Sequence, residues 1–141
     1  MCNWQPTAQW SGRTVSAGSE SFSEPETRAL RDFIQTTRPG VVVLWHSAAG
    51  GVFPGGCGDG SAFDASKTLA GLYAQATGYT GDSEPTGGGD RFTAYPITGD
   101  AANWISRQGI PALVVELATH DQIELDENWR GLRAILAEIA P

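Results

Sequence analysis

Two short, continuous apolar runs place the strongest limit on what this chain can fold into. One covers residues 41–45 and leads directly to His46, and the other covers residues 112–117 and contains Glu116. Runs of β-branched and aliphatic residues without alternation are typical of strands that are buried on both faces of a sheet. Both segments are therefore predicted to be buried strands, and His46 is predicted to end a central one.

Helical patterns separate and follow these two runs. At residues 23–26, Ser23 stands three positions before Glu26, which is the pattern of a reciprocal N-terminal cap. Helices are expected from there to Pro39, over residues 61–77, after a cap at Thr98 or Asp100, and over residues 126–139. Strands that alternate with helices predict an α/β fold, with a mixed, mostly parallel sheet of about four strands flanked by helices.

Apolar residues recur at helical spacing in the first and last of these helices, and those of the last share one face that is predicted to pack on the sheet. They are Ala29, Leu30, Phe33 and Ile34 in the first helix, and Trp129, Leu132, Leu136 and Ile139 in the last. Residues 1–22, 48–60 and 78–99 lack clear periodicity and are predicted to be surface loops. The length of the last loop is typical of a functional segment.

The composition indicates a single folded domain that spans residues 1–141. Hydrophobic residues make up 40% of the chain and charged residues 18%, which argues against disorder. The net charge is -7 and no run of Lys or Arg occurs, so a nucleic-acid partner is disfavoured. No apolar run approaches the length of a membrane span, so no membrane partner is expected. Cys2 and Cys57 fit either one disulfide in an oxidising compartment or two unrelated thiols.

Glu116 and His46 are the strongest candidates for catalytic or metal-binding residues. A carboxylate inside an apolar strand is desolvated unless it faces a polar site, which suits a general base; the alternative is a structural Glu paired with an Arg. His46 ends a strand at the position where ligands and catalytic groups of open α/β sheets collect. Its alternative is a core histidine whose hydrogen bonds are satisfied.

Four segments, in this order and spacing, resemble the zinc carboxypeptidase family (carboxypeptidase A-like). They are residues 22–27, the strand that ends in His46-Ser47, residues 95–104, and Gly109-Ile110-Pro111 leading to Glu116-Leu117. The resemblance covers nearly the whole chain and implies the C-terminal half of such a catalytic domain, with a partial carboxypeptidase A-like (phosphorylase/hydrolase-like) fold. It further implies a zinc-dependent hydrolase that cleaves peptide bonds near a C-terminus. The compartment stays open, and a secreted or periplasmic parent protein is one expectation.

The resemblance also implies roles for individual residues. His46 would be the third zinc ligand, and Glu116 the general base that activates the zinc-bound water. Tyr95 would be a mobile loop residue that closes over the bound peptide, although an aromatic anchor for the loop is the alternative. Ala102 would lie in the pocket for the terminal side chain of the substrate. No Asp stands at that position to select basic side chains, but Asp90 or Asp100 could do so.

The sequence also departs from the family pattern. The His-x-x-Glu motif that supplies the first two zinc ligands and the Asn-Arg pair that holds the substrate carboxylate are both absent. Because catalytic zinc normally has three protein ligands, we expect this chain to be inactive, or nearly so, without a missing N-terminal half. The alternative is a non-catalytic, truncated binding module that uses the loop 78–99 or an exposed sheet edge, with self-association through that edge.

Two further arrangements have weaker support. His120 lies four residues after Glu116, and with His46 these residues would form a two-His, one-carboxylate metal set if they converged. Ser47 could serve as a hydrolase nucleophile only with His120 as its base, and the usual Gly-x-Ser-x-Gly elbow is missing.

Overall fold

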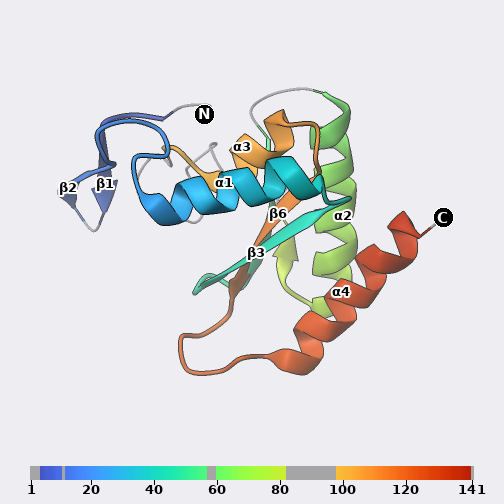
Figure 1. Cartoon of the computed structure of the whole chain (residues 1–141). Coiled ribbons are helices and arrows are strands. Elements are labelled where there is room, and N and C mark those ends of the chain that lie inside the picture. Colours follow the sequence, from blue (N-terminus) through green and yellow to red (C-terminus); the bar gives the residue numbers. More distant parts are fainter. Residues whose placement is uncertain (1–3, 11, 57–59, 82–97, 141) are drawn as a thin grey trace.

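The computed structural model describes residues 4–10, 12–56, 60–81 and 98–140 (Figure 1). Its strands are β1 (Thr7–Trp10), β2 (Arg13–Ser16), β3 (Val42–Ser47), β4 (Gly51–Pro54), β5 (Thr80–Gly81) and β6 (Ala112–Leu117). Its helices are α1 (Pro25–Thr37), α2 (Ser61–Thr77), α3 (Ala101–Arg107) and α4 (Leu125–Ile139). None of the described helices is both long enough and apolar enough to cross a membrane.

The main sheet is mixed and has the strand order β3-β6-β4-β5. β3 runs parallel to β6, β4 runs antiparallel to β6, and β5 runs parallel to β4. β1 and β2 form a separate antiparallel pair. The prediction of an α/β fold with a mixed sheet flanked by helices is therefore confirmed. The sequence patterns identified β3 and β6, but they missed the short strands in the segments predicted to be loops.

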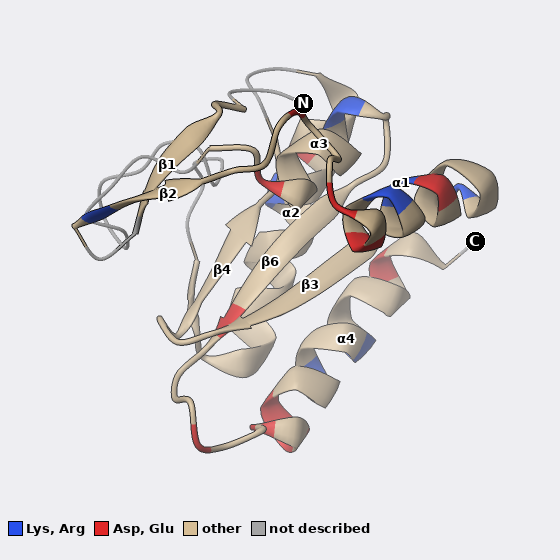
Figure 2. Ribbon diagram, turned by 60° about the vertical axis from the view of Figure 1, so that its left-hand side comes forward, with Lys and Arg blue, Asp and Glu red and all other residues tan. Residues whose placement is uncertain are grey.

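The helices cover the sheet on both sides (Figure 2). Val42, Leu44 and Val114 belong to a hydrophobic cluster with α1 and α3, whereas Val43 and Val115 belong to a second cluster with α2 and α4. Successive residues of a strand point to opposite faces, so this division follows directly from the continuous apolar runs. The result is a three-layer arrangement with the sheet in the middle.

The second cluster is centred on Tyr73 of α2, whose side chain is fully buried. Gly131 of α4 lies against the Tyr73 ring, because a Cβ atom built on this glycine would be only 2.6 Å from ring carbons. A residue without a side chain thus permits α4 to approach α2 closely.

The helix starts differ partly from their prediction. The reciprocal cap expected from Ser23 and Glu26 is absent: Ser23 Oγ donates to a Glu24 carboxylate oxygen at 3.0 Å, and α1 begins after Glu24 without a side-chain cap. For α3, one of the two expected caps is correct, because the Asn103 backbone N–H donates to Asp100 Oδ1 at 2.8 Å.

β3 does not have the central, doubly buried position that its apolar run predicts. It is the border strand of the sheet within the described residues, and its own residues are half-buried or exposed. β6 fits the prediction, because it lies between β3 and β4 and its first four residues are buried. The difference arises because no described strand covers the outer edge of β3.

Candidate active site

His46 and Glu116 lie side by side at the ends of β3 and β6. They are paired directly in the parallel ladder, and His46 Nδ1 is 3.5 Å from Glu116 Oε1. Each lies two residues after a residue that faces α1 and α3, Leu44 for His46 and Val114 for Glu116, so their side chains emerge on that face of the sheet. The His46 side chain is 59% exposed and that of Glu116 is 23% exposed. The structure thus brings together the two residues that the sequence singled out and leaves both open to solvent.

The loops that follow the two strands are tied to each other. The backbone N–H groups of Ala49 and Gly50 both donate to the Leu117 carbonyl, at 2.9 and 3.1 Å. Ser47 Oγ lies 3.0 Å from His120 Nδ1, so the loop after β6 is hydrogen-bonded to the end of β3. His120 is exposed and is engaged with Ser47. These contacts link the two loops beside the paired strand ends that carry His46 and Glu116.

The described residues do not by themselves make a zinc site. Among them, no group of three or more His, Cys, Asp or Glu side chains is placed to hold a metal ion, and this includes the set of His46, Glu116 and His120. A catalytic zinc ion normally has three protein ligands. One imidazole and one neighbouring carboxylate therefore do not fit a complete zinc site, although they fit part of one.

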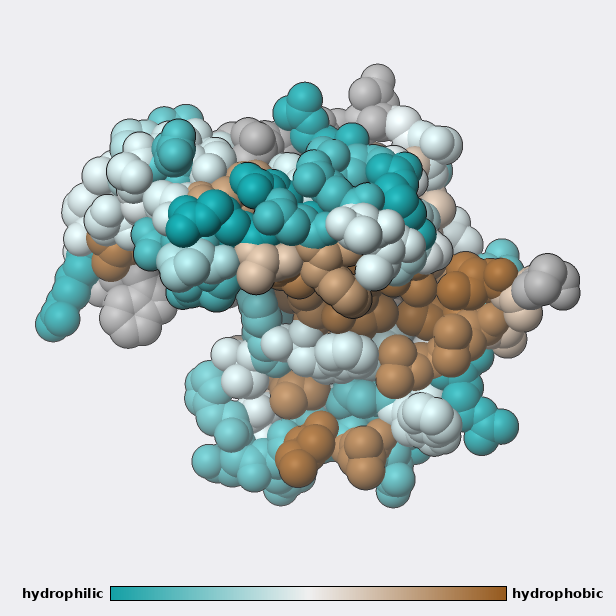
Figure 3. Space-filling model, in the orientation of Figure 1, coloured by the Kyte–Doolittle hydropathy of each residue, from teal (hydrophilic) through white to brown (hydrophobic). Residues whose placement is uncertain are grey.

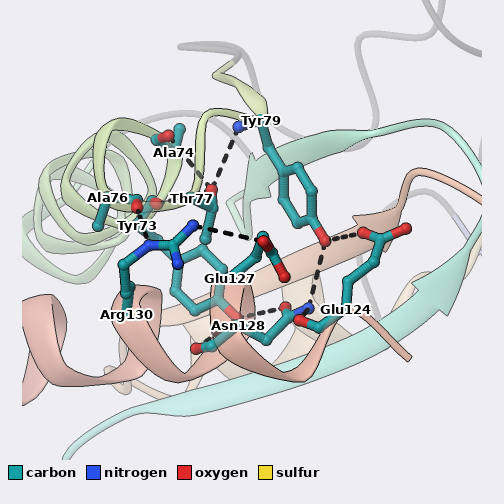
Figure 4. Close-up of polar contacts among 9 residues, drawn as sticks. All are labelled: Tyr73, Ala74, Ala76, Thr77, Tyr79, Glu124, Glu127, Asn128 and Arg130. Carbon is teal, nitrogen blue, oxygen red and sulfur yellow. Dashed lines mark hydrogen bonds and ion pairs between the residues drawn. The ribbon is translucent and has the colours of Figure 1, made fainter. Parts of the chain in front are cut away.

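A buried polar network lies behind this pair, on the α2 and α4 side of the sheet (Figure 4). Its centre is Asn128 of α4, whose Oδ1 accepts hydrogen bonds from Tyr73 Oη at 2.6 Å and from Trp45 Nε1 at 3.0 Å. Asn128 Nδ2 donates to Tyr79 Oη at 3.2 Å and to the Glu124 carbonyl at 2.8 Å. Since Trp45 immediately precedes His46, the network fixes the strand just before the candidate ligand.

Glu124 extends the network to the other strand end. Its carboxylate accepts from Tyr79 Oη and from the Ala118 backbone N–H, which is 3.1 Å from both carboxylate oxygens. Ala118 comes two residues after Glu116, so Glu124 anchors the loop that leaves the candidate base. Sequence analysis missed this network. Its only signal was the polar pair Glu124 and Asn128, spaced four apart at the start of an amphipathic helix.

The network shifts the pKa values of Tyr79 and Glu124 in opposite directions. Burial, together with the hydrogen bond to the Glu124 carboxylate, raises the pKa of Tyr79 to about 12. The same hydrogen bond lowers the pKa of Glu124, and backbone donors near Ala118 act in the same direction. Burial also raises the pKa of Tyr73. At neutral pH the Tyr79 hydroxyl therefore keeps its proton while Glu124 is ionised.

Glu124 should make the stability of the fold sensitive to acid. Because the folded state lowers its pKa from 4.5, ionised Glu124 contributes stability above that pH, and the contribution is lost as the pH falls through the folded-state pKa. We expect Glu124→Gln to reduce the free energy of unfolding at neutral pH and to flatten its decline in acid, as measured by urea denaturation across pH.

A matched control is available on the same helix. Glu138 of α4 is exposed, and the structure gives it no hydrogen bond or ion pair among the described residues, so Glu138→Gln should leave the acid profile unchanged. Equal acid sensitivity of wild type and Glu124→Gln would show that this carboxylate makes no special contribution.

Of the remaining residues predicted to belong to the site, the structure describes some and not others. Tyr95 and Asp90 lie outside the described residues, as do Cys2 and Cys57. Ala102 is fully buried in α3, against the backbone at Gly55. Its proposed place in a substrate pocket stays a prediction. A hollow of about 480 Å³ lies between the start of α2 and the end of α3, and neither His46 nor Glu116 lines it.

Comparison with known proteins identifies the family to which this chain belongs. The chain is similar to the crystal structure of the murein-tripeptide amidase MpaA from Escherichia coli O157, with a TM-score of 0.62 and 18% sequence identity. The match covers 97% of this chain and 54% of that chain, so this chain spans about half the length of the similar structure. A search of curated proteins found no match. The family model described as zinc carboxypeptidase matches residues 4–132, and the chain therefore belongs to the zinc carboxypeptidase family.

Proposed function

We propose that this chain is the C-terminal part of a zinc-dependent metallocarboxypeptidase, a hydrolase that cleaves peptide bonds near a C-terminus. The observation that supports the proposal best is the adjacency of His46 and Glu116 at the open end of two parallel strands. The family membership adds independent support, since it extends across both residues. The similar structure is a murein-tripeptide amidase, so amide bonds in cell-wall peptides are a second candidate substrate class.

In this proposal the two side chains have different tasks. His46 is one of the ligands that hold zinc, and a bound zinc ion would supply a Lewis acid. Glu116 is the general base, which takes a proton from the attacking water and can return it to the leaving amine. Tyr95 is proposed to close over the bound peptide, and Ala102 to lie in the pocket for its terminal side chain.

The proposal requires ligands that the described residues do not supply. We assign them to a missing N-terminal half, which would carry the His-x-x-Glu motif of the family. A single imidazole binds zinc weakly, whereas three ligands in place bind it tightly. The chain alone is therefore expected to be inactive or nearly so.

Calorimetric titration with zinc tests whether the zinc ligands are divided between this chain and an N-terminal half. We expect the chain alone to show no binding of micromolar or tighter affinity, and we expect tight binding and peptide hydrolysis once a separately expressed N-terminal half is added. His46→Ala should abolish the tight binding, whereas His120→Ala should leave it nearly unchanged. Tight zinc binding by the chain alone would contradict the proposal.

The alternative function is a non-catalytic binding module. One observation favours it, namely that the described residues contain no group of three metal-binding side chains. The same titration separates the two functions, because a binding module takes up no zinc with any N-terminal half.

A further inference from the structure

The hollow between the start of α2 and the end of α3 lies apart from the candidate active site. Its volume is about 480 Å³, and the described residues that line it are 60–63, 106, 107 and 109. Gly109 comes shortly before β6 begins at Ala112, whereas Glu116 is near the end of that strand. Four residues of strand span roughly 13 Å, so the hollow and Glu116 are at opposite ends of β6. Figure 1 shows the start of α2 and the end of α3 together at one end of the molecule.

The hollow also lies apart from the exposed hydrophobic residues near β3. None of the described residues that line it belongs to β3, α1 or α4. On the face shown in Figure 3, hydrophobic residues gather mainly between α1 and α4, and the end of the molecule where α2 starts is mostly hydrophilic or neutral. The surroundings of the hollow therefore suit a polar ligand better than an apolar one.

The start of α2 offers backbone donors that lack partners. The first N–H groups of an α-helix have no acceptor inside the helix. Gly60, the N-cap residue, provides no side-chain cap, and its carbonyl accepts only from the Phe63 and Asp64 amides, at 2.9 and 3.1 Å. The amides of Ser61 and Ala62 have no hydrogen-bond acceptor among the described residues. A bound anion would give both amides an acceptor, and the helix dipole would favour it.

Ser106 of α3 is a second and independent sign of a ligand. It lines the hollow and is only 7% exposed. Its hydroxyl makes no hydrogen bond to a described residue, not even to the carbonyl one turn earlier, as Ser66 Oγ does to the Ala62 carbonyl at 2.7 Å. Ser106 Oγ is not among the described atoms that are sealed from solvent without a partner, so it is reached through the hollow. Because buried hydroxyls are nearly always hydrogen-bonded, this one indicates a bound group that completes it.

Arg107 adds a positive charge to the same hollow. It is the last residue of α3, it is exposed, and none of the ion pairs between described residues involves it. Asp64, the acidic residue in the first turn of α2, is already paired with Lys67 at 2.9 Å. Arg107 also suits the carbonyl end of α3, so its charge alone would not define a site. Together with the free amides of α2 and the Ser106 hydroxyl, it completes a set of donors for an oxyanion.

We infer that the hollow binds the phosphate group of a small phosphorylated organic molecule, with the first amides of α2, the Ser106 hydroxyl and the Arg107 guanidinium as donors. Phosphate fits better than carboxylate because the donors come from two helices, and phosphate offers three acceptor oxygens in different directions. The volume of about 480 Å³ falls within the range of small-molecule sites and leaves room for an organic part, for which Phe63 supplies an apolar wall. This inference does not depend on the proposed function.

Nuclear magnetic resonance titration of the chain with inorganic phosphate and with phenyl phosphate tests the inference. Both should shift the amide signals of Ser61 and Ala62 in a saturable manner, and phenyl phosphate should bind more tightly because its ring can pack on Phe63. Benzoate carries the same ring with a carboxylate and should bind more weakly than phenyl phosphate. Benzoate that binds at least as tightly would overturn the choice of phosphate. Phenyl phosphate that binds no more tightly than inorganic phosphate would overturn the choice of an organic ligand.

Three variants test the donors themselves. Arg107→Gln should weaken the binding of phenyl phosphate by roughly 10–100-fold, and Ser106→Ala by roughly 10-fold, because each removes a hydrogen bond to a charged group. Arg133→Gln is the matched control: it removes an exposed positive charge on α4 that does not line the hollow, and it should leave binding unchanged. Circular dichroism establishes that each variant is folded. The absence of saturable shifts with both phosphates, or binding that neither Arg107→Gln nor Ser106→Ala weakens, would overturn the inference.

Discussion

Replacing Glu116 by Gln should lower the turnover of the proposed complete enzyme, in which this chain is joined by the N-terminal half that we assign to it, by about 10²–10⁴-fold. Glutamine keeps the shape of the side chain but cannot accept a proton from water. The zinc content should stay the same, because Glu116 is proposed as the base and not as a ligand. Peptide hydrolysis and metal analysis of the same preparation measure both effects.

His46 and His120 provide matched comparisons for this experiment. His46→Ala removes a proposed ligand and should eliminate zinc and activity together. His120→Ala removes a histidine whose side chain, among the described residues, is hydrogen-bonded to Ser47, and it should leave turnover nearly unchanged. A Glu116→Gln enzyme that hydrolyses peptides as fast as wild type would exclude this residue from proton transfer.

The position of the candidate pair was predictable from sequence because it depends on a simple property of parallel strands. Two apolar runs each carry an ionisable residue near their C-terminal end, and such ends meet at the same edge of a sheet. The structure places the two runs in neighbouring strands with His46 directly opposite Glu116. Periodicity also located α2 correctly, because its bounds depend on local signals.

Other features were not predictable because they depend on contacts distant in the sequence. Trp45 was assigned to a buried run, yet its indole N–H reaches Asn128, which lies 83 residues further along the chain. Helical spacing marked Trp129 and Leu136 as one apolar face, but α4 turns Asn128, Gly131 and Ile135 toward the core instead. Periodicity indicates that a helix has an apolar side, and only the neighbouring elements decide which part of that side is covered.

The Gly131→Ala substitution should destabilise the fold by about 1–3 kcal/mol, although alanine is the better helix former. The added Cβ would lie 2.6 Å from carbons of the Tyr73 ring, well inside the 3.4–4 Å of an ordinary van der Waals contact of a Cβ atom. The ring cannot easily move aside, because Tyr73 is fully buried and its hydroxyl is hydrogen-bonded to Asn128. Thermal unfolding should show a melting temperature lower by roughly 5–10 °C.

Gly71→Ala is the matched control, since it makes the same chemical change in the interior of α2, where nothing lies within 4 Å of the new Cβ. That variant should be more stable than wild type by about 0.5–1 kcal/mol, because alanine loses less backbone entropy in a helix. The two substitutions therefore have opposite expected signs, and the difference isolates the contact between α4 and Tyr73. If both variants gained stability, α4 would not approach α2 as closely as the structure shows, and the position of Asn128 behind β3 and β6 would need to be revised.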